Sequence, residues 1–159
     1  MLVRTCSALA LVVLLFVSIG YSQPKSKPSQ SQIESQMETN KELVKNFLNT
    51  AFNRKDVKAA AEMITERYIQ HNPGVPTGKA GFLQAIPGFY KMFPDMKWEL
   101  KHIWADGDYV ITHSHYQFAK EGNGSAVVDI FRIKDGKVDE HWDVSQEIPE
   151  KIAHTNGMF

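Results

Sequence analysis

The spacing of apolar residues changes once along this chain, close to Pro94, and this change constrains the fold more than any other feature. Before Pro94 the apolar residues recur at helical intervals, and after it they alternate with polar residues as in half-buried strands. Helices followed by a run of antiparallel strands are typical of an α+β domain. Because the helices come as one block, we expect them to pack on one face of a curved sheet and to enclose a pocket at its mouth.

Three helices are predicted before the spacing changes. Met37–Asn53 carries one apolar stripe, and Lys79–Met92 carries another. Asp56 is placed to cap a helix over Val57–Ile64, which Thr65–Gln70 is expected to extend by another turn.

Four strands are predicted after the change, each bounded by Gly-containing or Asp-containing turns. They cover Lys97–Ala105, Tyr109–Ala119, Ser125–Ile133 and Lys137–Gln146. Their order predicts an antiparallel meander.

The first 22 residues differ from the rest of the chain. Arg4 precedes the apolar stretch Ala8–Ile19, and small residues follow it in Gly20-Tyr21-Ser22. The apolar stretch is shorter than the about 20 residues of a membrane span. We therefore interpret residues 1–22 as a signal peptide, with an uncleaved anchor as the alternative, and expect a secreted or periplasmic protein with no membrane attachment in its mature form.

Residues 23–36 are rich in Ser, Gln, Pro and Lys and contain Ile33 as their only large aliphatic side chain. Such a composition favours a flexible linker. The folded domain is therefore expected to occupy residues 37–159. Since Cys6 is the only cysteine and lies in the predicted signal peptide, the domain must depend on its core and not on disulfides.

The charges balance, with 18 Lys plus Arg and 18 Asp plus Glu. A balanced chain without a basic cluster is unlike a nucleic-acid-binding protein. The expected partner is a small organic molecule held in a local site.

The stretch from Val127 to Val144 contains the candidate catalytic residues Asp129, His141 and Asp143. A three-residue loop of Lys134, Asp135 and Gly136 would pair Asp129 with His141 and put both aspartates and the histidine on one face. A two-residue loop would instead pair Asp129 with Trp142. In the first register the carboxylate would hold the imidazole in one tautomer, as expected of an acid/base pair; the alternative is an exposed ion pair on a solvated face.

Other pocket candidates come from the strand and helix ends. His113 and His115 are two residues apart, so they share one face of a strand, where they would either pack against helices or bind a metal with Asp129, His141 or Asp143. The site predicted here contains no metal.

Tyr68 and His71 are three residues apart and would project together from the last helical turn, unless this segment is only a capping turn. Phe82 and Trp142 are expected to form pocket walls, although the preferred register turns Trp142 outward with Ile130.

Several motifs resemble the SnoaL-like branch of the nuclear transport factor 2-like superfamily. They are Tyr68-Ile69-Gln70-His71-Asn72-Pro73, the helix start Gly78-Lys79-Ala80-Gly81-Phe82, and Asp129-Ile130-Phe131-Arg132 with Glu140-His141-Trp142-Asp143. The resemblance spans about Glu38 to Phe159, and Asn156-Gly157-Met158-Phe159 fits it. It implies a cone of three helices against a strongly curved antiparallel sheet, which often dimerises through the outer face of the sheet.

The family includes polyketide cyclases, ketosteroid isomerases, epoxide hydrolases and members that only bind ligands. The resemblance makes Asp129 and Asp143 candidate bases, with His141 beside them. We therefore expect a cofactor-free lyase or isomerase acting next to a carbonyl, in which Asp129 is the base, His141 its partner or the acid, and His71 and His115 hold the oxyanion. The alternatives are a non-catalytic small-ligand-binding module and a histidine metal site.

Overall fold

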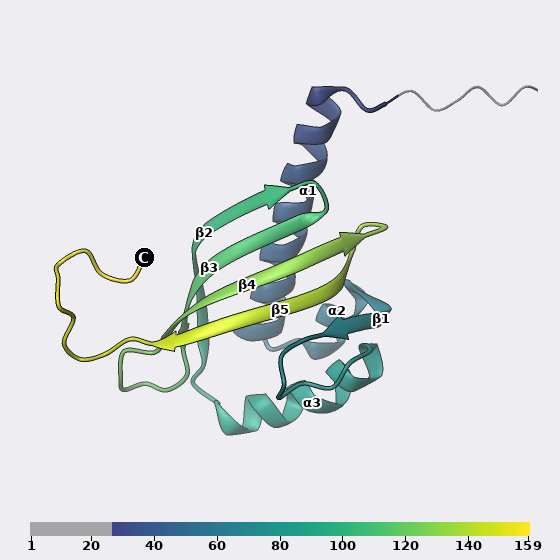
Figure 1. Cartoon of the computed structure of the whole chain (residues 1–159). Coiled ribbons are helices and arrows are strands. Elements are labelled where there is room, and N and C mark those ends of the chain that lie inside the picture. The colour runs from purple at the N-terminus through teal and green to yellow at the C-terminus, as the bar shows by residue number, and fades with distance from the viewer. Residues whose placement is uncertain (1–26) are drawn as a thin grey trace, which may run out of the picture.

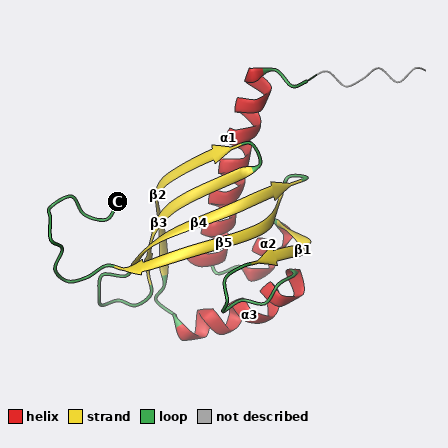
Figure 2. Cartoon of the chain, in the orientation of Figure 1, coloured by secondary structure: helices red, strands yellow, loops and turns green. Residues whose placement is uncertain are grey.

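A computed structural model of the chain describes residues 27–159, in which helices pack on one side of a five-stranded sheet (Figure 1). Along the chain, two helical segments come first, followed by one strand, a third helix and then four strands. Figure 2 marks the helices in red and the strands in yellow. The predicted α+β class is confirmed. The predicted signal peptide and the beginning of the predicted linker lie outside the described residues.

The sheet has the strand order β1-β5-β4-β3-β2. β2 to β5 form the predicted antiparallel meander, and the prediction missed β1, which runs parallel to β5 at the edge. The five strands are β1 (Ile64–Gln70), β2 (Lys97–Asp106), β3 (Tyr109–Gln117), β4 (Ser125–Lys134) and β5 (Lys137–Glu147).

α1 (Gln30–Leu48) continues into a π-helical turn over Asn49–Asn53, and α2 (Val57–Glu62) and α3 (Lys79–Met92) follow. α1 begins well before Met37, so part of the predicted linker is helical. Its start is stabilised by a capping box in which Ser29 and Gln32 satisfy each other's backbone N–H groups. This first part of the helix is exposed and projects beyond the sheet (Figure 1). In the described part of the chain, no helix is both long enough and apolar enough to span a membrane.

The segment predicted as an extra helical turn, Thr65–Gln70, belongs to strand β1 instead. Its backbone pairs with β5 across a register shift, and the N–H of His71 donates to the carbonyl of His141 at 3.0 Å. The β-branched residues Ile64, Thr65 and Ile69 favour an extended backbone. The partner strand lies about seventy residues further along the chain, so the local pattern alone could not reveal the pairing.

The β4–β5 hairpin differs from both predicted registers. Its turn has two central residues, Asp135 and Gly136, and both have positive φ, as a type I′ turn requires. A bulge at Asp139 then shifts the pairing, so Asp129 lies opposite Asp143 and Phe131 lies opposite His141. The predicted pairing of Asp129 with His141 is wrong, yet the bulge turns Asp129, His141 and Asp143 to the same face.

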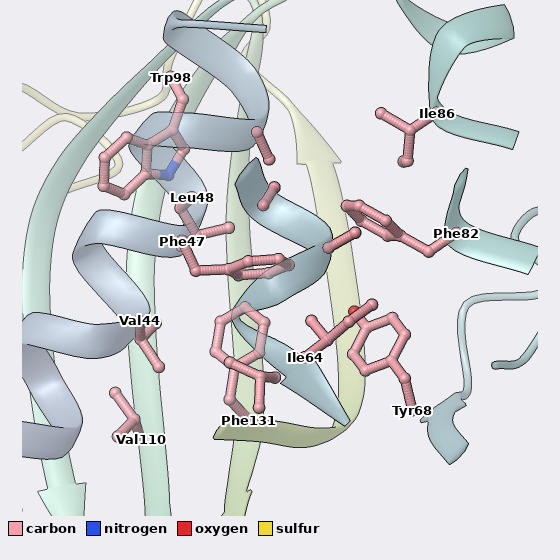
Figure 3. Close-up of a cluster of buried hydrophobic side chains, with 14 of the residues drawn as sticks. Val44, Phe47, Leu48, Ile64, Tyr68, Phe82, Ile86, Trp98, Val110 and Phe131 are labelled. Atoms are coloured by element: carbon pink, nitrogen blue, oxygen red, sulfur yellow. The ribbon is translucent and has the colours of Figure 1, made fainter. Parts of the chain in front are cut away.

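The core lies between the helices and the inner face of the sheet (Figure 3). Phe47 of α1 packs edge-on against Phe131 of β4, with ring centroids 6.0 Å apart, and it also contacts Phe82 of α3. Fully burying such a side chain contributes about 1.5–3 kcal/mol. α3 begins after Pro76, where a Cβ on Gly81 would lie 2.8 Å from the Pro76 carbonyl oxygen, so close packing requires glycine there. This core forms the rigid inner wall of the site.

Candidate functional site

A cavity of about 190 Å³ opens between the inner face of the sheet, α1 and α3. Most of its surface is apolar, and six phenylalanine rings line it: Phe47, Phe52, Phe82, Phe89, Phe118 and Phe131. An apolar cavity of about 150 Å³ in another protein holds one benzene molecule. The cavity thus has the size of a molecule with one ring and a few substituents.

The polar groups of the cavity are gathered on the strand side. β1 and the residues after it contribute Gln70 and Asn72, β4 contributes Asp129, and β5 contributes His141 and Asp143. Because alternate residues of a strand share a face, these side chains point inward while their neighbours point outward. A ligand in the cavity would therefore meet hydrogen-bonding groups on one side and aromatic rings on the other.

Asp129 is buried, with 3% of its surface exposed. One carboxylate oxygen, Oδ2, accepts hydrogen bonds from Thr112 Oγ1 at 3.2 Å and from the Tyr116 hydroxyl at 3.3 Å. Burial and the charge of Asp129 raise the pKa of Tyr116 well above its usual range, so this phenol stays protonated and donates. The other oxygen, Oδ1, lies 3.1 Å from His141 Nε2. Both oxygens of Asp129 are therefore engaged by protein groups.

His141 connects the two aspartates. Its Nε2 is 3.1 Å from Asp129 Oδ1 and 3.9 Å from Asp143 Oδ2, and its Nδ1 is 2.9 Å from Gln70 Oε1. The imidazole stacks on Phe131, with ring centroids 4.7 Å apart and an angle of 19° between the planes. Both ring nitrogens of His141 therefore have a polar partner, and Phe131 covers one face of the ring.

Asp143 is less enclosed, with 21% of its side chain exposed. Asn72 Nδ2 donates to its Oδ2 at 2.6 Å. No hydrogen bond from residues 27–159 reaches its other oxygen. Asp143 therefore lines the cavity, is partly exposed, and has one carboxylate oxygen without a hydrogen-bond donor among these residues.

The structure places His113 and His115 on the outer face of the sheet, so their prediction as pocket residues is wrong. The inward residues of β3 are the buried Val110, Thr112, Ser114 and Tyr116. His115 Nε2 bonds to the carbonyl of Asn123 at 2.8 Å, and the Phe159 ring lies against both histidines. A metal site that joins these histidines to Asp129 or His141 is ruled out because the sheet separates them.

His71 and Trp142 also lie outside the cavity, contrary to prediction. Their rings stack at 4.6 Å with an angle of 5° between the planes, and His71 Nε2 bonds to Glu140 at 2.8 Å. The physical reason is that Tyr68 and His71 belong to an extended segment and its continuation, not to one helical turn. Tyr68 and Phe82 do line the cavity. His71 and His115 thus cannot hold an oxyanion next to Asp129.

Gln70 and Asn72 were missed as site residues. They flank His71, and in an extended segment residues two apart share a face, so placing His71 outward puts both amides inward. The backbone N–H of Asn72 donates to Gln70 Oε1 at 2.9 Å, which ties the two residues together. An extended assignment for Ile64–Gln70 would have revealed them.

Within residues 27–159, one group of potential metal-ligating atoms lies close together, on Asp129, His141 and Asp143, all within 4.8 Å of one another. Thr112 and Tyr116 already donate to Asp129, and Asn72 already donates to Asp143. A cation would have to enter the contact between His141 and Asp129 and compete with these donors. The donor set suits proton transfer better than metal binding.

The comparisons with known proteins agree on one family. Residues 44–141, more than half of the chain, match the model of the SnoaL-like domain. A search of curated proteins found no match.

Solved structures show the same fold. A candidate polyketide cyclase from Acidithiobacillus ferrooxidans has a TM-score of 0.60 at 19% identity, covering 67% of this chain and 87% of its own. A candidate ketosteroid isomerase from Kribbella flavida has a TM-score of 0.60 at 20% identity, with coverage of 75% and 86%. The candidate polyketide cyclase IdmH from Streptomyces antibioticus has a TM-score of 0.54 at 24% identity, with coverage of 67% and 91%. At such identities the likeness establishes the fold alone.

Proposed function

This chain belongs to the SnoaL-like domain family of the nuclear transport factor 2-like superfamily, and we propose that its cavity catalyses proton transfer next to a carbonyl group. The substrate would be a small organic molecule, and the chemistry would need no cofactor. The carrying observation is the arrangement of one free carboxylate oxygen, on Asp143, beside the His141–Asp129 pair at the edge of an apolar cavity.

The contacts favour Asp143 over Asp129 as the base. Asp129 is buried, and each of its oxygens already contacts a protein group: Thr112 and Tyr116 donate to one, and His141 lies against the other. Asp143 lines the cavity, is partly exposed and has one oxygen that receives no hydrogen bond from the described residues. A general base must come within hydrogen-bond reach of the proton that it removes, and Asp143 meets this condition better.

The reaction would proceed through an enolate. Asp143 takes the proton from the carbon next to the carbonyl, and the electrons of that C–H bond move onto the carbonyl oxygen. The enolate oxygen replaces Asp129 Oδ1 as the acceptor of the N–H of His141 Nε2, while the Asp129 carboxylate, still held by Thr112 and Tyr116, balances the charge on the imidazole. Return of the proton from Asp143 to a different carbon completes an isomerisation. In an aldol-type step the enolate carbon instead attacks a second carbonyl, and the proton passes from Asp143 to the alkoxide that forms.

The cavity supports a substrate with a single ring. Its volume of about 190 Å³ is slightly above that of the cavity that holds benzene, and its phenylalanine rings match an apolar ring or chain. The carbonyl would face the strand side, where the polar groups lie. A multi-ring polyketide would exceed this volume.

The test is proton exchange, because it reports abstraction without knowledge of the complete reaction. A panel of single-ring ketones is incubated in D₂O, and deuterium at the carbon next to the carbonyl is followed by NMR. Wild-type protein is expected to accelerate exchange for at least one ketone. Asp143→Asn removes the base and should slow that exchange by at least about 100-fold, as general bases contribute about 10²–10⁴.

The matched control is Asp106→Asn, at the exposed end of β2 and far from the cavity, which should leave exchange unchanged. A ketone that binds, as shown by a rise in melting temperature, but undergoes no exchange with wild-type protein would contradict catalysis. That result would favour the non-catalytic binding module, which would use the same aromatic walls.

Two further proposals concern the setting of this activity. Arg4 and the apolar stretch Ala8–Ile19 support export and cleavage of residues 1–22. Exposed Trp104 and Tyr109 on the sheet support a homodimer through its outer face. N-terminal sequencing of the mature protein tests the first proposal, and sedimentation of a Trp104→Asp variant tests the second.

A further inference from the structure

Gln70 lies beside His141, and its side-chain amide contacts one of the two ring nitrogens. Its Oε1 lies 2.9 Å from His141 Nδ1 and also accepts the backbone N–H of Asn72 at 2.9 Å. Its Nε2 faces the hydroxyl of Tyr68 at 3.4 Å. The amide therefore touches three groups, and their chemistry decides which way it is oriented.

The Asn72 contact fixes this orientation. A backbone N–H can only donate, so the amide atom that faces it must be the oxygen. Rotating the amide by half a turn would place an NH₂ group against that N–H and also against His141. Since Oε1 can only accept, His141 Nδ1 must carry a hydrogen.

The same donor and acceptor argument applies to the other ring nitrogen, Nε2. A neutral imidazole has one N–H, and here it is on Nδ1. An unprotonated Nε2 would then face Asp129 Oδ1 at 3.1 Å, two acceptors without a hydrogen between them. The His141–Asp129 contact must therefore hold a second proton. The two hydroxyls on Asp129 Oδ2 and the stacked face of Phe131 favour placing that proton on His141.

We propose that Gln70 is a positioning residue that holds a proton on His141 Nδ1 and so keeps a second, transferable proton in the contact between His141 Nε2 and Asp129. The backbone of β1 sets its distance, because the N–H of His71 donates to the carbonyl of His141. The consequence for catalysis rests on the proposed function: a doubly protonated His141 is the stronger acid toward an enolate oxygen.

The proton positions can be measured directly by ¹⁵N NMR of the histidine rings in purified protein at pH 7. The protein has six histidines, and a His141→Asn variant identifies the signals of that ring by their loss. In wild-type protein His141 Nδ1 is expected to show the chemical shift of a protonated nitrogen. In Gln70→Leu, Nδ1 loses its acceptor, and its signal should move toward the unprotonated range as the ring keeps one proton on Nε2.

Two further variants make the test specific. Gln70→Glu retains an acceptor oxygen and should keep Nδ1 protonated, whereas Gln84→Leu changes an exposed glutamine on α3 and should change nothing. Ketone exchange should fall about tenfold in Gln70→Leu and stay at the wild-type rate in Gln84→Leu.

Wild-type Nδ1 without a proton, or a Gln70→Leu spectrum identical to that of wild type, would overturn the proposal. If Gln70→Leu does not fold, the wild-type and Gln70→Glu spectra still decide. If wild-type protein catalyses no ketone exchange but its ¹⁵N spectrum shows a protonated His141 Nδ1, the proposed function is refuted and this inference still holds.

Discussion

Both faces of the β4–β5 hairpin carry a buried aspartate, but the side chains that contact this aspartate differ between the two faces. On the outer side, Asp139 is completely buried and is held by Thr65, Arg67 and Arg132. On the inner side, Asp129 is almost as deeply buried, but in the described part of the chain no Lys or Arg reaches it. Its partners are two hydroxyls and an imidazole.

The difference lies in what the partners can do with a proton. An arginine stays charged at all accessible pH values, so an acid paired with it is locked in its ionised form. Arg67 and Thr65 lower the pKa of Asp139 to about 2, although burial opposes this shift, and bonds from His71 and Arg132 lower the pKa of Glu140. An imidazole can accept and release a proton near neutral pH. The outer acids therefore stabilise the fold, and the inner acids are available for chemistry.

The largest effect is expected for a substitution on the inner face of the hairpin. Asp129→Asn keeps the shape of the side chain but removes the charge that supports a protonated His141. We expect ketone exchange to fall by about 10²–10⁴-fold, the usual contribution of acid/base catalysis. The free energy of unfolding should change by about 1 kcal/mol, the net value of a typical hydrogen bond. Retention of full activity would contradict the assigned role of Asp129.

A substitution on the outer face should instead lower the stability of the fold and leave the exchange activity unchanged. Asp139→Asn removes the carboxylate that Arg67 and Arg132 share and should lower the free energy of unfolding by about 2 kcal/mol at pH 7. For a domain of this size the melting temperature should fall by roughly 3–5 °C per kcal/mol. Exchange activity measured below the transition should stay close to wild type. Activity lost in proportion to that of Asp129→Asn would show that the two faces are not independent.

The bounds of most helices and strands were predicted correctly because they depend on local sequence patterns. The bounds of α3 agree residue for residue with the apolar spacing, and the four predicted strands end within one or two residues of the observed ones. Gly136 lies in the hairpin turn, as predicted. Such features depend on neighbouring residues, which a single sequence displays.

The features that escaped prediction depend on distant partners. At the bulge, the Asp139 carboxylate accepts hydrogen bonds from Thr65 and Arg67 of β1, a strand that pairs with the distant β5. Two deviations then added up: the shorter hairpin turn and the bulge each shift the register by one residue in the same direction, and a total shift of two leaves the same side chains on the same face. Asp129, His141 and Asp143 consequently meet as expected, although by a different register. The outward positions of His71, His113 and His115 follow from the same long-range pairing.

The smallest expected effect is the pH dependence of the stability that Asp139 contributes. Asp139 has a folded-state pKa of about 2, below the value near 3.9 of an unfolded aspartate. A lowered folded pKa contributes stability above the unfolded pKa, and this stability is lost as the pH falls from about 4 to about 2. The shift corresponds to about 2–3 kcal/mol at most, and the contribution should be smaller because Arg67 is half exposed and screened by solvent.

The measurement compares urea unfolding of wild-type protein and Asp139→Asn at several pH values between 7 and 2. The stability gap between them should be constant from pH 7 to about 5 and should shrink below pH 4, because protonation removes from the wild type what the mutation already removed. Asp106→Asn, with its exposed carboxylate, should run parallel to wild type throughout. A gap that persists unchanged at pH 2 would mean that Asp139 stabilises the bulge by its shape and hydrogen bonds alone, and the outer face would then owe nothing to its fixed charges.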